Sequence, residues 1–338
     1  MNGTERCTWH KPNELRQHMK FMMSKRRLLV TGSKGFVGTA LTNEVRARFS
    51  DRFEYVGFMD PETDAPADLR NGDAVARAVR SAAPDAVIHL AATAAPREAK
   101  KDPVRAWEVN VLGSLHLTKA LMQHAPNAVF VWSGSSEAYG RSFDRSDAPI
   151  CEEQPLEPIS PYGATKAATD IMLRQMARDG LRATIFRPFN HSGPGQSADY
   201  VVSSFAYQIA CIEAGIQDSV LKVGNLEAER DFLDVRDVVN AYVTAALNTK
   251  DLHGEAYNLA TGQPIRIHQI LEKLISLAKC KITVEQDPER YVPSDIPKAS
   301  GNPSKALTEL GWKPSIPLET TLSDVLEYWR QHVPPHQC

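Results

Sequence analysis

Tyr162 and Lys166 lie four residues apart in the segment YGATK, a spacing that places two side chains on one face of a helix. Pro161 directly precedes them and predicts that the helix begins there. A phenol is a weak acid at neutral pH, and an adjacent ammonium group favours the phenolate and lowers its pKa. The pair therefore predicts a proton shuttle, in which Lys166 makes Tyr162 usable for acid and base chemistry.

A cluster of hydroxyl groups follows an apolar run upstream of this pair, in the segment VFVWSGSSEAYG. Ser135 and Glu137 come where a buried strand is expected to end, and ligands of parallel sheets bind at that end of the strands. A Tyr-x-x-x-Lys pattern by itself is more often an exposed helix pair. Together with the serine cluster and a glycine turn further upstream, it indicates hydride transfer to or from an alcohol carbon.

The glycine turn spans residues 31–38, reads TGSKGFVG, and stands between an apolar run and a helical stretch. Gly32 can adopt the tight turn, Gly35 lets the backbone approach a pyrophosphate, and Gly38 permits close packing of helix on strand. The spacing G-x-x-G-x-x-G departs from the commoner G-x-G-x-x-G. A purely structural turn is therefore the alternative to a dinucleotide-binding loop.

Other residues within the turn, and Asp60 further along the chain, refine the cofactor prediction. Phe36 and Val37 open the helix, whose N-terminal N–H groups attract anions. Asp60 closes the second apolar run, where an acid can bond the adenosine ribose hydroxyls, and this favours NAD over NADP. Lys34 in the turn could accept a 2′-phosphate, so NADP stays possible. The alternative for Asp60 is a turn residue.

Short apolar runs alternate with helix-length stretches, which predicts a parallel sheet covered by helices on both faces. A loop rich in Gly and Pro after Phe189 indicates the start of a second, smaller domain. We therefore predict a flexible N-terminal extension (1–26), a cofactor domain (27–189, with a late strand at about 256–261) and a substrate-binding domain (190–255 and 262–330).

Composition limits the classes of partner. The 338 residues are 42% hydrophobic and 24% charged, enough to bury a sizeable core. The formal net charge of −2 supplies no broad basic field, so we expect neither a nucleic-acid nor a membrane partner. No run approaches the roughly 18 apolar residues of a membrane helix. Five scattered cysteines without a C-x-x-C pair predict no metal site and fit a reducing cytoplasm.

Over nearly all of residues 27–330 the chain resembles the extended short-chain dehydrogenase/reductases, the NAD-dependent epimerase/dehydratase family. The match includes TGSKGFVG, HLAA, NVLGS and PYGATK. The resemblance implies an α/β fold, a Rossmann-like doubly wound parallel sheet with a smaller C-terminal α/β substrate-binding domain, and a homodimer formed through two helices of the first domain. It also implies site residues: Asp68 and Leu69 at the adenine, Leu90, Ala91 and Ala92 beside the cofactor, Asn110 holding the active-site geometry, and Ser135, Tyr162 and Lys166 as the catalytic triad.

The second half resembles the GDP-4-keto-6-deoxymannose reductases, through RPFNHSGPGQ, VGNLEAERDFLDVRDV and GWKPSIPLETTL. This resemblance implies that Asn190 and Arg230 bind the substrate diphosphate and that Lys222 lies near the nucleotide. A guanidinium group suits that role because it binds phosphate oxygens bidentately. Val292 stands where the family often has an arginine near the nucleotide, and Arg290 is the candidate to replace it.

Three functional hypotheses follow. In the first, a reduced nicotinamide delivers hydride to C4 of a GDP-4-keto-6-deoxyhexose, Ser135 hydrogen-bonds the carbonyl oxygen and Tyr162 donates the proton, which yields GDP-rhamnose. The second is an NAD-retaining nucleotide-sugar 4-epimerase or 4,6-dehydratase. Glu137 resembles the dehydratase acid that removes a sugar proton, although no Asp precedes it, which favours a supporting hydrogen bond. The third is a non-enzymatic dinucleotide sensor, which the intact catalytic residues disfavour.

Overall fold

The computed structural model describes residues 25–145, 147–248, 254–291 and 294–333. The predicted N-terminal extension lies outside these ranges except for Lys25 and Arg26. Among the helices of the described ranges, none has the length and apolar character needed to cross a membrane.

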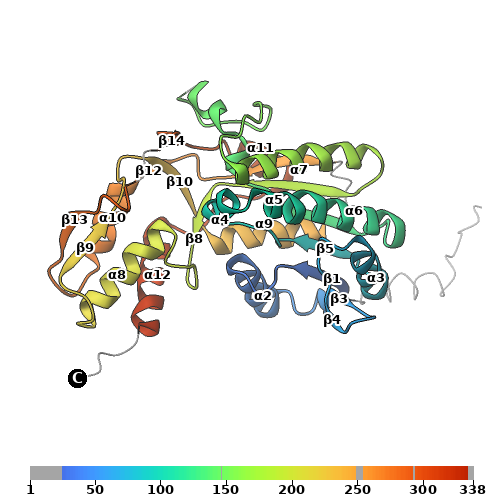
Figure 1. Cartoon of the computed structure of the whole chain (residues 1–338), viewed down its shortest axis with the longest axis horizontal. Coiled ribbons are helices and arrows are strands. Elements are labelled where there is room, and N and C mark those ends of the chain that lie inside the picture. The colour runs from blue at the N-terminus through green and yellow to red at the C-terminus, as the bar shows by residue number, and fades with distance from the viewer. Residues whose placement is uncertain (1–24, 146, 249–253, 292–293, 334–338) are drawn as a thin grey trace, which may run out of the picture.

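A six-stranded parallel sheet forms the centre of the larger lobe (Figure 1), and its strand order is β11-β7-β6-β5-β1-β2. Every strand develops from one of the apolar runs, which confirms the predicted parallel sheet. The second run divides, because its last two residues form the short strand β3, which pairs with β4. The bounds are β1 (Arg26–Thr31), β2 (Phe53–Val56), β3 (Met59–Asp60), β4 (Ala65–Pro66), β5 (Ala86–His89), β6 (Val129–Ser133), β7 (Ala183–Pro188) and β11 (Glu255–Leu259).

Helices cover both faces of this sheet. On one face lie α3 (Gly72–Ala82), α6 (Gly113–His124) and α7 (Pro161–Arg178), whose apolar side chains share a core with the strands. On the other face lie α2 (Phe36–Arg48) and α9 (Val235–Leu247).

Helix α9 differs from the predicted domain division, which placed residues 190–255 in the second domain. Val238, Val239 and Tyr242 are fully buried in the core between α9 and the sheet. Because α9 carries a wide apolar face that the sheet covers, it belongs with the cofactor-domain layers.

The segment before α6 contains a π-helix. The chain runs through α4 (Pro96–Lys101), α5 (Pro103–Trp107) and a π-helical turn at Glu108–Leu112. The turn places Asn110 inside the protein, with 4% of its surface exposed. Such turns are rare and frequently occur at functional sites.

The smaller lobe is attached at the carboxyl edge of the sheet, because β7 leads almost directly into β8. Strand β10 joins its parts: it pairs with β12 and β14 at one end and with β8 at the other. Apolar side chains of three helices pack into a separate core. The bounds are β8 (Asn190–Ser192), α8 (Val201–Glu213), β9 (Val220–Val223), β10 (Glu229–Asp234), β12 (Pro264–Arg266), α10 (Ile267–Ser276), β13 (Thr283–Gln286), β14 (Lys298–Ala299) and α12 (Leu318–His332). Helix α11 (Ser304–Leu310) packs instead against β11, with Ala306 buried in the core of the larger lobe.

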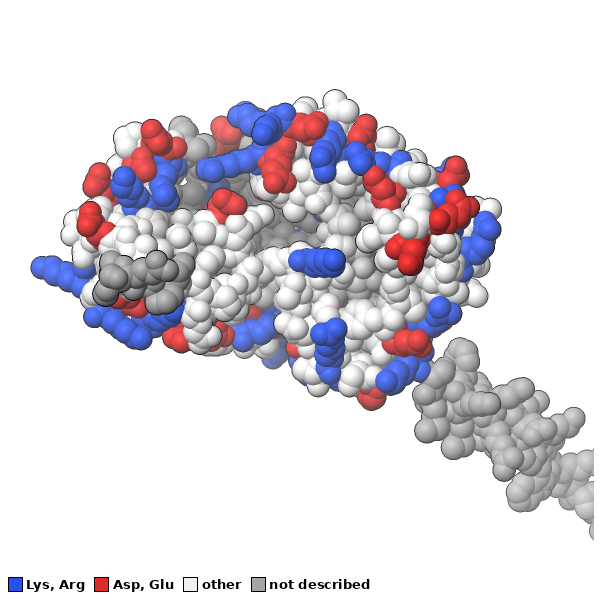
Figure 2. Space-filling model, turned by 60° about the horizontal axis from the view of Figure 1, so that its bottom comes forward, with Lys and Arg blue, Asp and Glu red and all other residues white. Residues whose placement is uncertain are grey.

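The surface carries mixed charge. Figure 2 shows lysines, arginines and acids interspersed over one face, which is hollowed near its middle. This distribution agrees with the net charge of −2 and provides no extended basic field on that face.

Candidate active site

The glycine turn links β1 to α2 and requires glycine at two positions. Gly32 has a φ of +71°, and a Cβ there would lie 2.7 Å from the backbone nitrogen of Ala91. A Cβ on Gly38 would lie 2.3 Å from the carbonyl oxygen of Gly32. Gly35 is different, since its Cβ would meet only that same oxygen, at 3.4 Å. Gly32 and Gly38 therefore serve packing, and Gly35 leaves space above the turn.

The first turn of α2 fits the pyrophosphate of a dinucleotide. The helix begins at Phe36, no side chain caps its N-terminus, and no acid occupies its first turn. The ring of Phe36 stacks on that of His191, and Val37 packs against the core, so both residues turn their side chains away from solvent. Backbone N–H groups and the positive end of the helix dipole are what this turn offers an anion.

Asp60 does not present a free carboxylate. Its two oxygens accept hydrogen bonds from Arg77, at 2.8 and 2.6 Å, and the backbone N–H of Glu62 donates to one of them. Only 4% of the residue is exposed, and the pKa of the carboxyl is lowered by the Arg77 hydrogen bonds. The preference for NAD was predicted from an acid free to bind the ribose hydroxyls. Because Asp60 is paired with Arg77, this carboxylate is not free, and the sequence did not reveal the pair.

One of the two predicted adenine residues lines a surface cavity of about 400 Å³ beside α3 and the π-helical turn. Asp68 lines it and forms an ion pair with Arg70, whereas Leu69 is buried in the core. The remaining residues predicted to flank the cofactor follow β5 at the carboxyl edge of the sheet and are partly buried: Leu90, Ala91 and Ala92.

The catalytic helix α7 begins where the sequence predicts. The hydroxyl of Ser160 accepts a hydrogen bond from the backbone N–H of Gly163, and Pro161 takes the first helical position. Tyr162 follows in the first turn, and its phenol is hydrogen-bonded by Ser135. Ser135 in turn accepts from the backbone N–H of Glu137, at 3.1 Å. Strand β6 and helix α7 thus bring the predicted hydroxyl pair together.

The electrostatics of Tyr162 differ from the prediction. Burial raises the pKa of the phenol, and the nearby Glu137 carboxyl raises it further, whereas the hydrogen bond from Ser135 opposes them. Desolvation disfavours the phenolate more than the surrounding groups favour it, so Lys166 does not lower this pKa as expected. Tyr162 therefore keeps its proton at neutral pH and is suited to donate it.

Lys166 lies one turn further along α7, with its Nζ 5.7 Å from the centre of the Tyr162 ring and 5.0 Å from that of Trp132. Its ammonium group donates to the carbonyl oxygen of Ser133, at 2.6 Å. Burial lowers the pKa of Lys166 to about 7. Perturbed pKa values of this kind are typical of functional sites.

Asn110 connects the segment after β5 to helix α7 through its side chain. Its side-chain oxygen accepts from the N–H of Thr93, at 2.8 Å, and its amide group donates to the hydroxyl of Thr165, at 2.9 Å. That hydroxyl donates to the carbonyl oxygen of Tyr162. Thr165 was not singled out from the sequence, although it lies inside the YGATK motif.

Arg230 and Glu137 connect the two lobes electrostatically. Arg230 lies on β10, donates to the hydroxyl of Ser294 at 2.8 Å, and lowers the pKa of Glu137. Burial is stronger and raises the pKa of Glu137 above its usual value, while Ser160 donates a hydrogen bond to this acid. Asn190, an exposed residue, pairs with the same strand two residues beyond Arg230.

The remaining predicted substrate residues are not joined to the catalytic groups by any contact in the described residues. Lys222 is exposed on β9. Arg290 forms an ion pair with Asp287, with 3.3 Å between their charged atoms. Val292 lies outside the described residues. Tyr200, which sequence reasoning missed, is close enough to Tyr162 and Glu137 to interact with both electrostatically.

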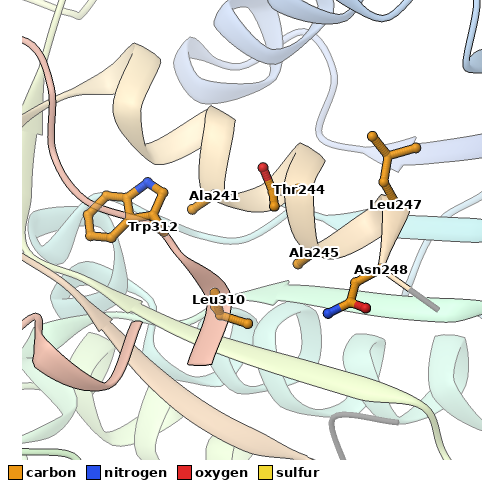
Figure 3. A pocket seen from close by; sticks show the side chains of 7 residues that line it. All are labelled: Ala241, Thr244, Ala245, Leu247, Asn248, Leu310 and Trp312. Carbon is orange, nitrogen blue, oxygen red and sulfur yellow. The ribbon is translucent and has the colours of Figure 1, made fainter. Parts of the chain in front are cut away.

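A pocket of about 230 Å³ lies apart from these groups, between α9 and the segment after α11 (Figure 3). Small apolar side chains and the ring of Trp312 form most of its lining, and it contains no titratable side chain. None of the predicted site residues lines it, so it contributes nothing to the candidate active site.

A doubly wound parallel sheet, a glycine turn at its carboxyl edge, and a half-buried tyrosine one helical turn from a buried lysine define a dinucleotide-dependent oxidoreductase of the short-chain type. The family model described as GDP-mannose 4,6 dehydratase matches residues 29–325. The chain belongs to this family of extended short-chain dehydrogenase/reductases and is one of its enzymes.

Three similar proteins illustrate the relationship. A GDP-6-deoxy-D-mannose reductase from Pseudomonas aeruginosa is 34% identical over 91% of this chain and 98% of its own length. The structure of RMD from the same organism, complexed with NADPH, has a TM-score of 0.82 at 32% identity and covers 91% of this chain and 100% of that one. A Thermus thermophilus UDP-glucose 4-epimerase complexed with NAD has a TM-score of 0.73 at 27% identity, with the same coverages.

Proposed function

We propose that this protein reduces the C4 keto group of a GDP-4-keto-6-deoxyhexose with NAD(P)H and yields GDP-rhamnose. The observation that carries the proposal is the hydroxyl pair of Tyr162 and Ser135 at the carboxyl edge of the parallel sheet, with burial raising the pKa of the phenol. Reduction of a ketone needs a proton donor, and a phenol with a raised pKa holds its proton until the carbonyl oxygen becomes basic.

The catalytic residues divide the work. A reduced dinucleotide with its pyrophosphate at the glycine turn would supply the hydride from its nicotinamide. Ser135 hydrogen-bonds the carbonyl oxygen and stabilises the negative charge that develops there. Tyr162 donates its proton to that oxygen, and the ammonium group of Lys166, 5.7 Å from the phenol ring, stabilises the phenolate that remains.

Substrate binding falls to the smaller lobe. Arg230 is held by Ser294 and lies within electrostatic reach of Glu137, which places a cation near the catalytic groups. We assign the diphosphate to Arg230 and Asn190, and the nucleotide end to Lys222 and Arg290. The similarity to a GDP-6-deoxy-D-mannose reductase supports the guanine nucleotide.

The test is direct. Purified protein supplied with GDP-4-keto-6-deoxymannose and NADPH or NADH is expected to oxidise one cofactor per sugar and to form GDP-rhamnose, identified by mass spectrometry and NMR. Reduction of a UDP- or CDP-linked ketone in preference to the GDP sugar would overturn the substrate assignment. Absence of oxidation with either cofactor would overturn the reductase assignment.

The second candidate is a redox-neutral 4-epimerase or 4,6-dehydratase, and Glu137 is the observation that favours it. This partly buried acid has a raised pKa, receives a hydrogen bond from Ser160 and acts electrostatically on Tyr162. An acid so placed could remove a proton from a sugar carbon. Such a cycle regenerates its cofactor, so denatured protein would release NAD in a 1:1 ratio, whereas a reductase exchanges its cofactor freely.

We infer that the cofactor site accepts NADPH as well as NADH. Asp60 is paired with Arg77 and offers no free carboxylate to repel a 2′-phosphate, and Lys34 is exposed in the glycine turn. The structural similarity to a protein complexed with NADPH supports this. Comparison of kcat/KM for the two cofactors tests it.

We further propose that the chain forms a homodimer in the cytoplasm. Val104 and Trp107 on α5, Leu112 on the π-helix and Ile171 on α7 are 68%, 44%, 46% and 61% exposed on elements that pack side by side. Large exposed apolar patches indicate interfaces, and a charge at Ile171 is expected to give monomers in sedimentation.

The free thiols of Cys151, Cys211 and Cys280 support a reducing compartment.

A further inference from the structure

His89 ends strand β5, is 2% exposed, and makes two side-chain hydrogen bonds to opposite sides of the site. Its Nδ1 lies 2.6 Å from the hydroxyl of Thr31, the residue directly before Gly32 of the glycine turn. Its Nε2 lies 3.0 Å from the hydroxyl of Ser114 in α6. The ring therefore bridges the strand that carries the cofactor turn and the helix that follows the π-helical turn.

The hydrogen-bond partners fix the tautomer. Ser114 donates its single proton to the carbonyl oxygen of Asn110, at 2.6 Å, because a carbonyl can only accept. Ser114 must then accept from the Nε2–H of His89, which leaves Nδ1 without a proton. Nδ1 accepts from Thr31, whose oxygen in turn accepts from the N–H of Ala91, at 3.3 Å.

The same chain continues to the catalytic helix. Asn110, whose carbonyl receives Ser114, donates through its side chain to the hydroxyl of Thr165, and Thr165 donates to the carbonyl of Tyr162. Thr169 adds a second bond from α7 to the Asn110 carbonyl, at 3.1 Å. One connected network therefore runs from the cofactor turn, through His89, to the backbone of the residue that donates the proton.

We propose that His89 is a positioning residue that holds the cofactor turn in place through Nδ1 and Thr31, and the catalytic helix in place through Nε2, Ser114 and Asn110. The proposal rests on the proposed function, since it assumes that the glycine turn binds NAD(P) and that Tyr162 acts on the substrate. A small shift between these two elements would misplace the reacting groups, and such shifts cost rate even when every catalytic residue is present.

The neutral ring is essential to this arrangement. Burial and the nearby Lys166 ammonium group lower the pKa of His89 to about 3, so the acceptor at Nδ1 persists across the working range of pH. A side chain that replaces His89 without loss must accept at the δ position and donate at the ε position.

Two variants of His89 each remove one of its two hydrogen bonds and keep the other. In His89→Asn the side-chain oxygen can replace Nδ1 and accept from Thr31, but nothing reaches Ser114. In His89→Gln the amide nitrogen can replace Nε2 and donate to Ser114, but the acceptor for Thr31 is lost. We expect His89→Asn to lower kcat about ten-fold with the cofactor Kd unchanged, and His89→Gln to raise the cofactor Kd about ten-fold with kcat at saturation nearly unchanged.

Hydrogen exchange gives a second readout that needs no substrate. His89→Asn should accelerate exchange in peptides covering 108–114 and 161–169 and spare 28–38, and His89→Gln should show the reverse. Thr118→Val removes a buried hydroxyl from the same helix, where it bonds to Ser114 and Leu115 carbonyls, and should leave both patterns unchanged. If the histidine variants do not fold, Ser114→Ala and Thr31→Val sever the same two bonds one at a time.

Equal changes in kcat and Kd for both histidine variants, or exchange patterns indistinguishable from that of Thr118→Val, would overturn the proposal. The cofactor Kd and the exchange pattern are measured without sugar. A wild-type protein that binds NADPH but reduces no GDP sugar would therefore contradict the proposed function and still allow His89 to be tested.

Discussion

Helix α7 carries two buried ionisable groups one turn apart, Lys166 and Asp170, and their surroundings are opposite. Asp170 accepts two hydrogen bonds from Arg187, at 2.8 and 2.9 Å, and each of these side chains is 1% exposed. Arg187 also donates to the hydroxyl of Tyr139 and the carbonyl of Glu152. This region therefore matches every charge with a partner.

In the catalytic region, Lys166 and Glu137 form no direct ion pair with another described residue, although Arg230 acts on Glu137 over a longer distance. Lys166 donates to a backbone carbonyl and lies over two aromatic rings, and burial alone lowers its pKa. Glu137 and Tyr162 also have pKa values raised by burial. A buried group without a counter-charge costs stability and stays near a protonation change. Under the proposed function, the Asp170 region stabilises the fold and the Lys166 region carries out the chemistry.

The largest effect, on kcat, is expected from a substitution in the catalytic region. Tyr162→Phe removes the proton donor and should lower kcat about 10²–10⁴-fold. Circular dichroism and the free energy of unfolding should stay close to those of the wild type, because the aromatic ring remains and only the hydroxyl is lost. A variant that turns over within a few-fold of the wild type would remove Tyr162 from the mechanism.

At the matched end, Asp170→Asn should act on stability. The substitution leaves the guanidinium of Arg187 buried without its counter-charge, which costs about 3–5 kcal/mol. Urea denaturation measures this loss. Glu44→Gln is the control, because its partner Arg48 is 60% exposed and the pair should contribute less than about 1 kcal/mol. Similar losses for the two variants would erase the distinction between the regions.

The pH dependence of stability sharpens the comparison. Lys166 loses its proton near pH 7 in the folded chain but near its ordinary pKa of 10.5 in the unfolded chain. Between these values the unfolded state binds more protons, so the free energy of unfolding should rise with pH relative to Lys166→Met, by up to about 4 kcal/mol. Denaturation curves from pH 6.5 to 10 measure it, and parallel curves for the two proteins would contradict it.

The smallest effect is expected at the glycine turn. Lys34→Ala removes an exposed cation and should raise the KM for NADPH roughly five-fold. The KM for NADH should not change, because NADH lacks the 2′-phosphate. Steady-state kinetics with both cofactors distinguishes this from general damage to the turn, which would raise both KM values together.

Much of the fold could be predicted from the sequence because its signals are local. The apolar runs predicted the positions of the six strands. The glycines of the turn indicated where the backbone leaves no room for a side chain. The proximity of Ser135, Tyr162 and Lys166 could also be predicted. Ser135 follows the end of a strand, and Tyr162 and Lys166 are four residues apart on one helix.

The rest depends on contacts between distant residues. The pairing of Asp60 with Arg77 joins β3 to α3, and no pattern in either segment predicts that these two side chains meet. The π-helical turn at 108–112 differs from an α-helix by a single hydrogen-bond shift, which leaves no periodic signal. The raised pKa of Tyr162 reflects burial in the complete fold, so the motif alone predicted the wrong direction.

Hydride delivery to C4 of the sugar, with the proton supplied by Tyr162, is the step that an isotope-labelling experiment tests most directly. NADPH carrying deuterium at both nicotinamide C4 positions, incubated with GDP-4-keto-6-deoxymannose, should give a product one mass unit heavier, with the label at C4 of the sugar. Tyr162→Phe should form almost none of it in the same time. An unlabelled product, or labelled product formed equally fast by the variant, would contradict the account.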